Sequence, residues 1–407
     1  MNQIPITPLY MKASDMPIGI VGAGAMGAGI TLVAASHGHP VVLADAQSAA
    51  VARARADHVS TLNRDVEKGR KTRDEADETQ RRITYVEGVD ASQLIAFSDC
   101  WMVIEAIVEQ LAAKQALFRA LESVVATHAL LASNTSSLSI AALGGACARA
   151  ERVLGVHFFN PATLMPLVEI IPAISTAPDL TILAENLVQS WGKTTVRAKD
   201  TPGFLVNRVA RPFYGESLRL LDEGRADAAT IDWAMTTIGG FRMGPFALMD
   251  MIGNDVNFAV SCSVYENTFH DPRYRPSVTQ QRMVEAGWLG QKTRRGYYTY
   301  GAGATRPTPV EDVELGTQIV QRVLAMLVNE AVSAQELGIA SAADIEIAMT
   351  KGVNYPRGLL AWGDQIGAAQ VLSTLESLQH EYGDARYRPA PRLRRIATTP
   401  DGRLLDG

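Results

Sequence analysis

The chain has 407 residues, which is enough for two or three domains. Of these residues 47% are hydrophobic and 20% charged, a composition that is ordinary for a globular protein. Its formal net charge of −5 gives no general electrostatic reason to bind nucleic acid or an anionic membrane, so we expect neither as a partner. No apolar run approaches the ~18 residues of a membrane span. Residues 1–16 lack the basic and apolar segments of a signal peptide, so we interpret them as a leader and expect a cytoplasmic protein.

The three cysteines, Cys100, Cys147 and Cys262, are few and odd in number. They form no C-x-x-C pair, so the sequence predicts neither a disulfide framework nor a zinc site, and we expect no bound metal. This usage fits a reducing compartment.

The most informative stretch lies between an expected strand at 18–21 and a helical pattern at about 25–37. It holds three glycines, Gly22, Gly24 and Gly27, with the spacing G-x-G-x-x-G. In such a motif the first glycine allows a tight turn, the second lets the backbone approach a pyrophosphate, and the third lets helix and strand pack closely. The amide groups of the helix N-terminus then face the phosphates. The motif predicts a dinucleotide site, with a flavin site or a simple packing turn as alternatives.

A second expected strand, at 41–43, is followed by Asp45, which lies 18 residues beyond Gly27. A carboxylate at this place binds the ribose hydroxyls of the adenosine in NAD. It would repel a 2′-phosphate, so we predict NAD rather than NADP as the cofactor.

The chain is organised in four parts after the leader. From 17 to 200, short apolar runs alternate with helical patterns, which indicates an α/β domain with a parallel sheet and crossover helices. The expected strands are 18–21, 41–43, 102–104, 130–132, 153–156, 168–171 and 194–197. Residues 200–203 (DTPG) are a break, and the sequence is almost wholly helical after it. We expect a helical domain at 201–300, a linker at 301–314 and a second helical domain at 315–407.

The two helical domains are related by an internal repeat with a constant offset of 114 residues, as between positions 208 and 322. The repeated residues include arginine, glutamate, aspartate and several glycines, which chance does not explain. The matched positions include Arg208 and Arg322, Glu216 and Glu330, Gly224 and Gly338, Gly244 and Gly358, Asp250 and Asp364, and Gly253 and Gly367. The copies differ at Asn207, which is Gln321 in the second copy.

A polar helical stretch at 47–83 carries basic residues around Lys68, followed by an acidic run. One interpretation is a solvated helix pair with ion pairs between its faces. The other is a basic clip for the phosphates of a bulky anionic ligand.

Polar residues at 133–137 (SNTSS) follow an expected strand, at the edge of the sheet where open α/β folds bind ligands. They could also cap the next helix. His157 ends another strand, and Glu169 lies twelve residues later inside an apolar strand. If the intervening loop turns the chain back, the two would meet, and a buried carboxylate would fix the imidazole's tautomer and strengthen it as a base. The alternative is a structural ion pair. Asn207 is either a plain helix-start residue or a donor into a cleft between domains.

Together, the sequences at 21–27, 133–138, 157–161, 168–169 and 200–208 resemble the L-3-hydroxyacyl-CoA dehydrogenase family, over about residues 17–300. The resemblance implies a Rossmann-type NAD-binding domain followed by tandem all-α domains of the type found at the C-terminus of 6-phosphogluconate dehydrogenase, with acyl-CoA held between the domains. It implies that His157 is the general base and Glu169 its orienting partner. It further implies that Ser136 and Asn207 hydrogen-bond the substrate oxygen, that Glu105 and Asn134 lie near the nicotinamide, and that the segment around Lys68 contacts CoA.

The second helical copy resembles the duplicated tail of longer bacterial members, where it packs on the first copy much as a partner subunit does. The loss of the asparagine at Gln321 fits a structural role for this copy. Either the tandem copies satisfy the dimer surface internally, or a homodimer forms through other faces.

One departure from the family pattern lies at 241–245, where Tyr-Pro-x-Gly-Pro is replaced by FRMGP. With residues 254–260, it resembles the branch of the family in phenylacetate degradation, whose substrate is 3-hydroxyadipyl-CoA. Arg242 could pair with the free carboxylate of such a substrate, or be a surface arginine.

The function expected from the resemblance is NAD-dependent oxidation of an L-3-hydroxyacyl-CoA of the 3-hydroxybutyryl or 3-hydroxyadipyl type, in fatty-acid or phenylacetate degradation. The alternatives are a dehydrogenase of a hydroxy acid without CoA and a non-catalytic NAD-binding protein.

Overall fold

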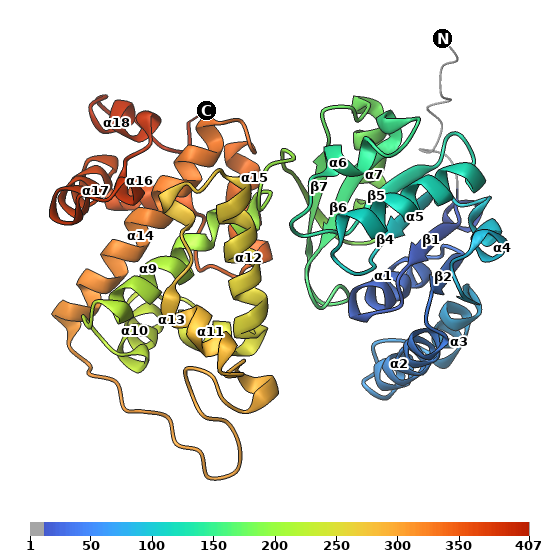
Figure 1. Cartoon of the computed structure of the whole chain (residues 1–407), viewed down its shortest axis with the longest axis horizontal. Helices are drawn as coiled ribbons and strands as arrows, with labels where there is room; N and C mark the ends of the chain where they lie inside the picture. The colour runs from blue at the N-terminus through green and yellow to red at the C-terminus, as the bar shows by residue number, and fades with distance from the viewer. Residues whose placement is uncertain (1–11, 407) are drawn as a thin grey trace. The chain divides into compact units, whose positions relative to one another are not determined.

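The computed structural model describes residues 12–406, and the chain divides into two compact units, with the boundary in the sequence between Asp200 and Thr201. Figure 1 shows the first unit in blue to green and the second in green to red. Residues 1–11 of the expected leader lie outside the described residues. The rest of it contains one 3₁₀ turn, Ala13–Asp15.

The first unit is built on an eight-stranded sheet with the order β3-β2-β1-β4-β5-β6-β7-β8. The strands are β1 (Ile18–Val21), β2 (Val41–Asp45), β3 (Ile83–Glu87), β4 (Met102–Glu105), β5 (Leu130–Ser133), β6 (Val153–Phe158), β7 (Leu167–Pro172) and β8 (Thr194–Arg197). The strands β1, β4 and β5 are buried along their whole length, which explains their continuous apolar sequences. The neighbouring strands β3, β2, β1, β4, β5 and β6 are parallel, so their carboxyl ends lie at one edge of the sheet.

The sheet is parallel except between β6 and β7, which are antiparallel. The expectation of a parallel sheet is thus wrong at this one pair. The physical reason is the connection: eight residues, 159–166, join the two strands, and a parallel crossover needs a dozen or more.

The sequence pattern does not predict the strand β3, because Ile83 falls in the polar stretch 47–83, for which helices are expected. It lies at the edge of the sheet, and only Ile83 of its five residues is buried. An edge strand of this kind lacks the apolar run of its neighbours, so its β-branched and aromatic residues were the only available signal.

The helices of the first unit include the expected helix after the glycine motif and a polar helical pair, α2 and α3. They are α1 (Ala25–Ser36), α2 (Ser48–Glu67), α3 (Arg73–Arg81), α4 (Ala91–Leu94), α5 (Leu111–Val124), α6 (Ile140–Gly144) and α7 (Pro178–Ser190), with 3₁₀ turns at Ile95–Phe97 and Ala150–Arg152. Thr72 and Glu75 form a reciprocal cap at the start of α3. Arg73 Nη1 of α3 donates to Asn63 Oδ1 of α2 over 2.7 Å, but no ion pair among the described residues joins the two helices, so the expected ion pairs between their faces are absent there.

The second unit is helical, as expected, and contains both copies of the repeat. Its helices are α8 (Val206–Val209), α9 (Arg211–Asp222), α10 (Ala228–Trp233), α11 (Pro245–Ile252), α12 (Asn254–Asn267), α13 (Val278–Glu285), α14 (Val313–Glu336), α15 (Ala342–Ile347), α16 (Leu359–Ile366), α17 (Ala368–Tyr382) and α18 (Pro391–Ala397). Shorter turns lie at Ala234–Ile238, Pro272–Tyr274, Gln291–Thr293, Ala348–Gly352 and Ala385–Tyr387. Because α14 begins at Val313, the last two residues of the expected linker are helical. No helix among residues 12–406 is long and apolar enough to cross a membrane.

The two copies contact each other through crossed ion pairs at repeated positions. Arg208 Nε donates to Glu330 Oε1 over 2.7 Å, and Arg322 Nε donates to Glu216 Oε1 over 2.6 Å. Each pair joins the arginine of one copy to the repeated glutamate of the other. A π-helical turn also recurs in both copies, at Ala234–Ile238 and Ala348–Gly352. This approximate twofold relationship supports an interpretation of the second unit as two packed copies of one domain.

Candidate active site

The glycine motif forms the turn between β1 and α1, and each glycine meets a different constraint. Gly22 has a φ of +110°, and a Cβ there would lie 2.4 Å from the Ala106 carbonyl oxygen. A Cβ on Gly27 would lie 1.8 Å from the Gly22 oxygen, so helix and strand are in close contact. Above Gly24 the space is open, with no atom of the described chain within 4 Å of an added Cβ. Since Gly24 caps α1, this open surface and the helix N-terminus fit a pyrophosphate.

Asp45 lies at the carboxyl end of β2 and is held against the glycine loop. Its Oδ2 accepts from the Ala23 amide over 2.7 Å, and its Oδ1 accepts from the Gln47 amide over 2.8 Å. The side chain is half-buried, and each carboxylate oxygen has a further lone pair for a ribose hydroxyl. The residues present therefore fit NAD, and Gly22, Gly24, Gly27 and Asp45 are the ones that would hold its adenosine and pyrophosphate.

His157 and Glu169 are directly opposite each other in the antiparallel pair β6 and β7. The His157 Nδ1 and the Glu169 Oε2 are 2.7 Å apart. His157 is 6% exposed, and Glu169 is fully buried. The predicted turn after the histidine strand thus brings the two side chains together, as the acid–base hypothesis requires.

Asn134 joins the ends of two strands beside His157. Its Oδ1 accepts from the Phe158 backbone N–H over 2.8 Å, and its backbone N–H donates to the Glu105 carbonyl over 2.8 Å. It therefore fixes the loop after β5 against the end of β6, near the imidazole. The placement supports its predicted proximity to the nicotinamide.

Glu105 is fully buried at the end of β4, and both of its carboxylate oxygens are engaged. Oε1 accepts from Lys114 Nζ and from the Ile107 amide, each over 2.6 Å, and Oε2 accepts from Ser133 Oγ over 2.6 Å. Both oxygens are thus held by the protein itself, and the place of Glu105 near the nicotinamide stays a prediction.

Two residues that sequence reasoning missed, Glu109 and Lys114, organise the serine-rich loop. Glu109 Oε1 accepts from Thr135 Oγ1 over 2.5 Å, from the amides of Ser136 and Ser137, and from Ser137 Oγ. Lys114 Nζ lies 3.0 Å from Glu109 Oε2 and is itself 1% exposed. Burial opposes ionisation of Glu109, but Lys114 and the hydroxyl donors prevail and lower its pKa. Their short spacing after the buried strand β4 is the only feature of the sequence that sets them apart, and it does not show that they reach the serine-rich loop.

The remaining predicted residues lie as follows. Ser136 is half-buried in this loop. Asn207 is also half-buried and is the second residue of α8, so it does not open the helix as expected; Leu205 caps α8. Arg242 is exposed beside the buried Phe241. Lys68 is exposed at the C-terminal cap of α2.

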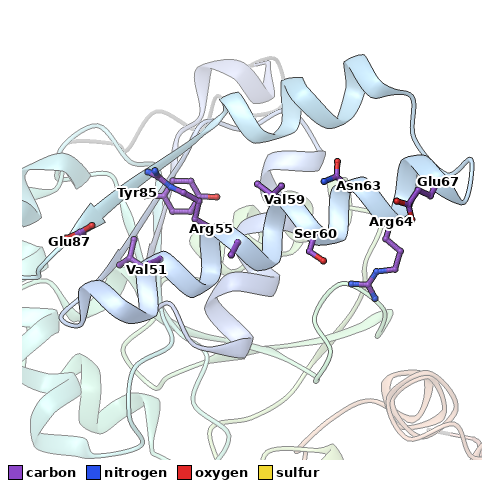
Figure 2. A pocket seen from close by; sticks show the side chains of 11 residues that line it. Val51, Arg55, Val59, Ser60, Asn63, Arg64, Glu67, Tyr85 and Glu87 are labelled. Atoms are coloured by element: carbon purple, nitrogen blue, oxygen red, sulfur yellow. The ribbon is translucent and has the colours of Figure 1, made fainter.

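A hollow of about 940 Å³ lies along α2. Figure 2 shows its lining side chains in a row on this helix, with Tyr85 and Glu87 of β3 near its N-terminal half. Arg55 lies 4.5 Å from the ring centre of Tyr85, and Arg64 lines the hollow further along the helix. Lys68 lies one turn beyond Arg64. The basic residues thus follow one helix, which agrees with a clip for an anionic ligand.

Two family models match the chain. The NAD-binding domain of 3-hydroxyacyl-CoA dehydrogenase matches residues 17–201, and the C-terminal domain of 3-hydroxyacyl-CoA dehydrogenase matches residues 203–300 and again residues 318–403. This chain belongs to the 3-hydroxyacyl-CoA dehydrogenase family. Since the first match is the NAD-binding domain of a dehydrogenase, the chain is an NAD-dependent oxidoreductase, and the predicted cofactor is confirmed.

Similar members of the family are known from several organisms. The chain is 37% identical to the 3-hydroxyadipyl-CoA dehydrogenase of Escherichia coli, over 96% of this chain and 99% of that protein. It is 37% identical to the mitochondrial hydroxyacyl-coenzyme A dehydrogenase of Homo sapiens, over 69% of this chain and 90% of that protein. The crystal structure of a 3-hydroxybutyryl-CoA dehydrogenase from E. coli superposes with a TM-score of 0.89 and 36% identity, covering 94% of this chain and 98% of that one. These likenesses confirm the predicted fold class.

Proposed function

We propose that this dehydrogenase oxidises the 3-hydroxyl group of an L-3-hydroxyacyl-CoA to a ketone, reversibly, with NAD as the oxidant. The observation that carries the proposal is the contact of His157 with the buried Glu169 at the ligand-binding edge of the sheet. The names of the relatives, which are dehydrogenases of hydroxyacyl-CoA substrates, agree with it.

In this proposal His157 is the general base. Because Glu169 accepts a hydrogen bond from Nδ1, the neutral imidazole carries its hydrogen there, and Nε2 is the nitrogen that takes the hydroxyl proton. The Glu169 carboxylate then stabilises the imidazolium that forms. NAD, when bound, would supply the acceptor for the hydride that leaves C3.

Ser136 and Asn207 are proposed to hydrogen-bond the substrate oxygen and so to orient the C3 carbon. Ser136 is suited to this task because its loop is fixed by Glu109, which accepts from its amide. A fixed donor costs less entropy on binding than a mobile one. Asn134 positions the same loop against the end of β6, where His157 lies.

The CoA part of the substrate is proposed to lie along α2. Arg55 and Arg64 line the hollow there, and Lys68 extends the basic row, so phosphates bound on this face would meet several cations. Glu67 and Glu87 at the margins of the hollow favour a ligand that keeps its phosphates near the arginines.

The acyl chain that we propose is a dicarboxylic one, as in 3-hydroxyadipyl-CoA, because the E. coli relative of that name matches almost the full length of this chain. The pathway is accordingly proposed to be phenylacetate or fatty-acid degradation. We place the reaction in the cytoplasm, where bacteria such as E. coli keep NAD and CoA thioesters. A homodimer stays a prediction. The alternative is that the crossed ion pairs between the two copies replace the dimer interface within one chain.

The test is an assay of NADH formation with L-3-hydroxybutyryl-CoA, L-3-hydroxyadipyl-CoA and the corresponding acids without CoA. The proposal expects turnover with the thioesters and at least about 100-fold lower kcat/KM without CoA. Equal rates with the free acids would support the alternative of a dehydrogenase for non-CoA hydroxy acids. No turnover with any of them, at saturating NAD, would support a non-catalytic protein.

A further inference from the structure

The first residue of α9, Arg211, is a buried arginine whose charge the protein does not neutralise. It is 7% exposed, and no carboxylate among residues 12–406 lies within 4.0 Å of its guanidinium. The buried Arg152, Arg208 and Arg322 each have such a partner. Arg386 has none within that distance but lies in the field of Glu216 and Asp384. A buried charge is costly unless it is paired, so Arg211 needs an explanation.

The groups that do contact Arg211 are neutral. Its Nε donates to the Asn207 carbonyl over 2.8 Å, and its Nη1 donates to Ser261 Oγ over 3.2 Å and to the Asn257 carbonyl over 3.5 Å. Its guanidinium carbon lies 4.8 Å from the ring centre of Tyr214. Nη2 donates to no acceptor in the described part of the chain, so one edge of the guanidinium is available to a ligand. Burial lowers the pKa of Arg211, which reflects the missing counter-charge.

The second copy of the repeat shows that the fold itself does not require this cluster. At the offset of 114 residues, Arg211 corresponds to Ala325, and its neighbours Tyr214, Asn257 and Ser261 correspond to apolar residues. These are Val328, Val371 and Leu375, and all four equivalents are at most 3% exposed. One domain therefore packs this place with four apolar side chains, whereas the other places a cation there with three polar neighbours. A polar replacement of a well-packed core costs stability, which points to a ligand in the first copy.

The position of the cluster indicates which part of the substrate it would meet. Arg211 lies one helical turn after Asn207 and is bonded to its carbonyl. Asn207 is the residue proposed to contact the substrate oxygen at C3, so the cluster lies near the acyl chain. One buried cation among neutral groups balances a single negative charge, whereas a phosphate brings up to two. A guanidinium edge also matches the two oxygens of a carboxylate.

We infer that Arg211 binds the terminal carboxylate of a dicarboxylic 3-hydroxyacyl-CoA and so selects such substrates over simple fatty acyl chains. The inference rests on the proposed function, and it assigns the recognition to a buried residue in place of the exposed Arg242. The tyrosine and serine neighbours would supply the remaining hydrogen-bonding surface of the site.

The test compares two substrates with the same six-carbon chain, L-3-hydroxyadipyl-CoA and L-3-hydroxyhexanoyl-CoA, which differ only by the terminal carboxylate. We expect the wild type to prefer the adipyl substrate by about 100-fold in kcat/KM, and Arg211→Met to bring this ratio close to one, mainly through KM. The matched control is Arg282→Met on the exposed face of α13, which should keep the wild-type ratio.

A binding measurement separates recognition from folding. Adipyl-CoA, which lacks the reacting hydroxyl, should raise the unfolding midpoint of the wild type more than hexanoyl-CoA does, and Arg211→Met should abolish the difference. Arg211→Ala, which copies Ala325, should unfold no earlier than the wild type without ligand, because it removes an unpaired buried charge.

Three results would overturn the inference. They are a wild type without preference between the two substrates, an Arg211→Met enzyme that loses both activities equally, and a loss of preference on Arg242→Met with none on Arg211→Met. A wild type that oxidises neither substrate would instead contradict the proposed function.

Discussion

His157 of β6 and Glu169 of β7 are neighbours because two strands run antiparallel at one place in an otherwise parallel sheet. The carboxylate is fully buried, so its hydrogen bond to Nδ1 is not in competition with water. The short loop after β6 thus decides whether the imidazole has a partner. It is the local feature on which the proposed chemistry depends most.

Replacing Glu169 by glutamine should keep the imidazole in place but weaken it as a base, since the amide bears no charge to stabilise the imidazolium. We expect kcat to fall roughly 10- to 100-fold, with little change in the Kd for NAD. Steady-state kinetics and a separate NAD titration would measure both. Glu151→Gln, a half-buried glutamate of the same unit that pairs with Arg149, is the control. A normal kcat in Glu169→Gln would leave the pair with a structural role only.

Asp45→Ala removes the carboxylate that joins the glycine loop to the end of β2. We expect the Kd for NAD to rise roughly 10- to 100-fold, because charged hydrogen bonds to the ribose are lost, and the preference for NAD over NADP to shrink. Calorimetric titration with the two nucleotides would show this. The exposed Asp57→Asn in α2 serves as the control, and an unaltered affinity in Asp45→Ala would refute the ribose contact.

Lys114→Met leaves Glu105 buried with an unpaired charge. We expect the first unit to lose about 3–5 kcal/mol of stability, as is typical when one partner of a buried pair is removed. The double variant Glu105→Gln with Lys114→Met should recover part of that loss, because the charge is then gone. Denaturant unfolding of the three proteins, with the fluorescence of bound NADH as a second probe, would measure the difference. The same stability in the single and the double variant would contradict the pairing.

Asp232 gives the helical unit a pH dependence. Burial raises the pKa of Asp232 to about 6, against hydrogen bonds from the Phe246 and Ala247 amides and the Tyr298 hydroxyl, which lower it. The folded state therefore binds the Asp232 proton more tightly than the unfolded state does. The contribution of this proton to the free energy of unfolding is complete below about pH 4 and is lost as the pH rises through 6. The stability of the wild type relative to Asp232→Asn should fall by about 2 kcal/mol between pH 4 and pH 7. Unfolding curves over that range would test it, and a constant difference would exclude the shift.

The strands that carry the site could be predicted from the sequence because they are buried along their length and end in polar residues. The glycine motif, Asp45 and the His157–Glu169 pair all lie at such strand ends, where an apolar run stops abruptly. The repeat could also be predicted from the sequence, because Arg208, Glu216 and their equivalents Arg322 and Glu330 recur at a constant offset. These four residues form the ion pairs between the two copies.

Other features depend on packing that no local pattern reveals. The edge strand β3 has mostly exposed side chains, so its sequence resembles that of the polar helices before it. Glu109 and Lys114 looked like ordinary surface charges, and only the fold brings them to the serine-rich loop. Arg211 resembled any helix-start arginine until its burial and its apolar equivalent, Ala325, could be compared.

The most direct test of the proposed chemistry is the turnover of His157→Gln with L-3-hydroxybutyryl-CoA or L-3-hydroxyadipyl-CoA at saturating NAD, next to its Kd for NAD. We predict a loss of kcat of at least about 1,000-fold with a Kd for NAD within about twofold of the wild type, because the base is removed and the nucleotide loop is untouched. A His157→Gln enzyme with near wild-type kcat would contradict the account, since no other residue in it takes the hydroxyl proton.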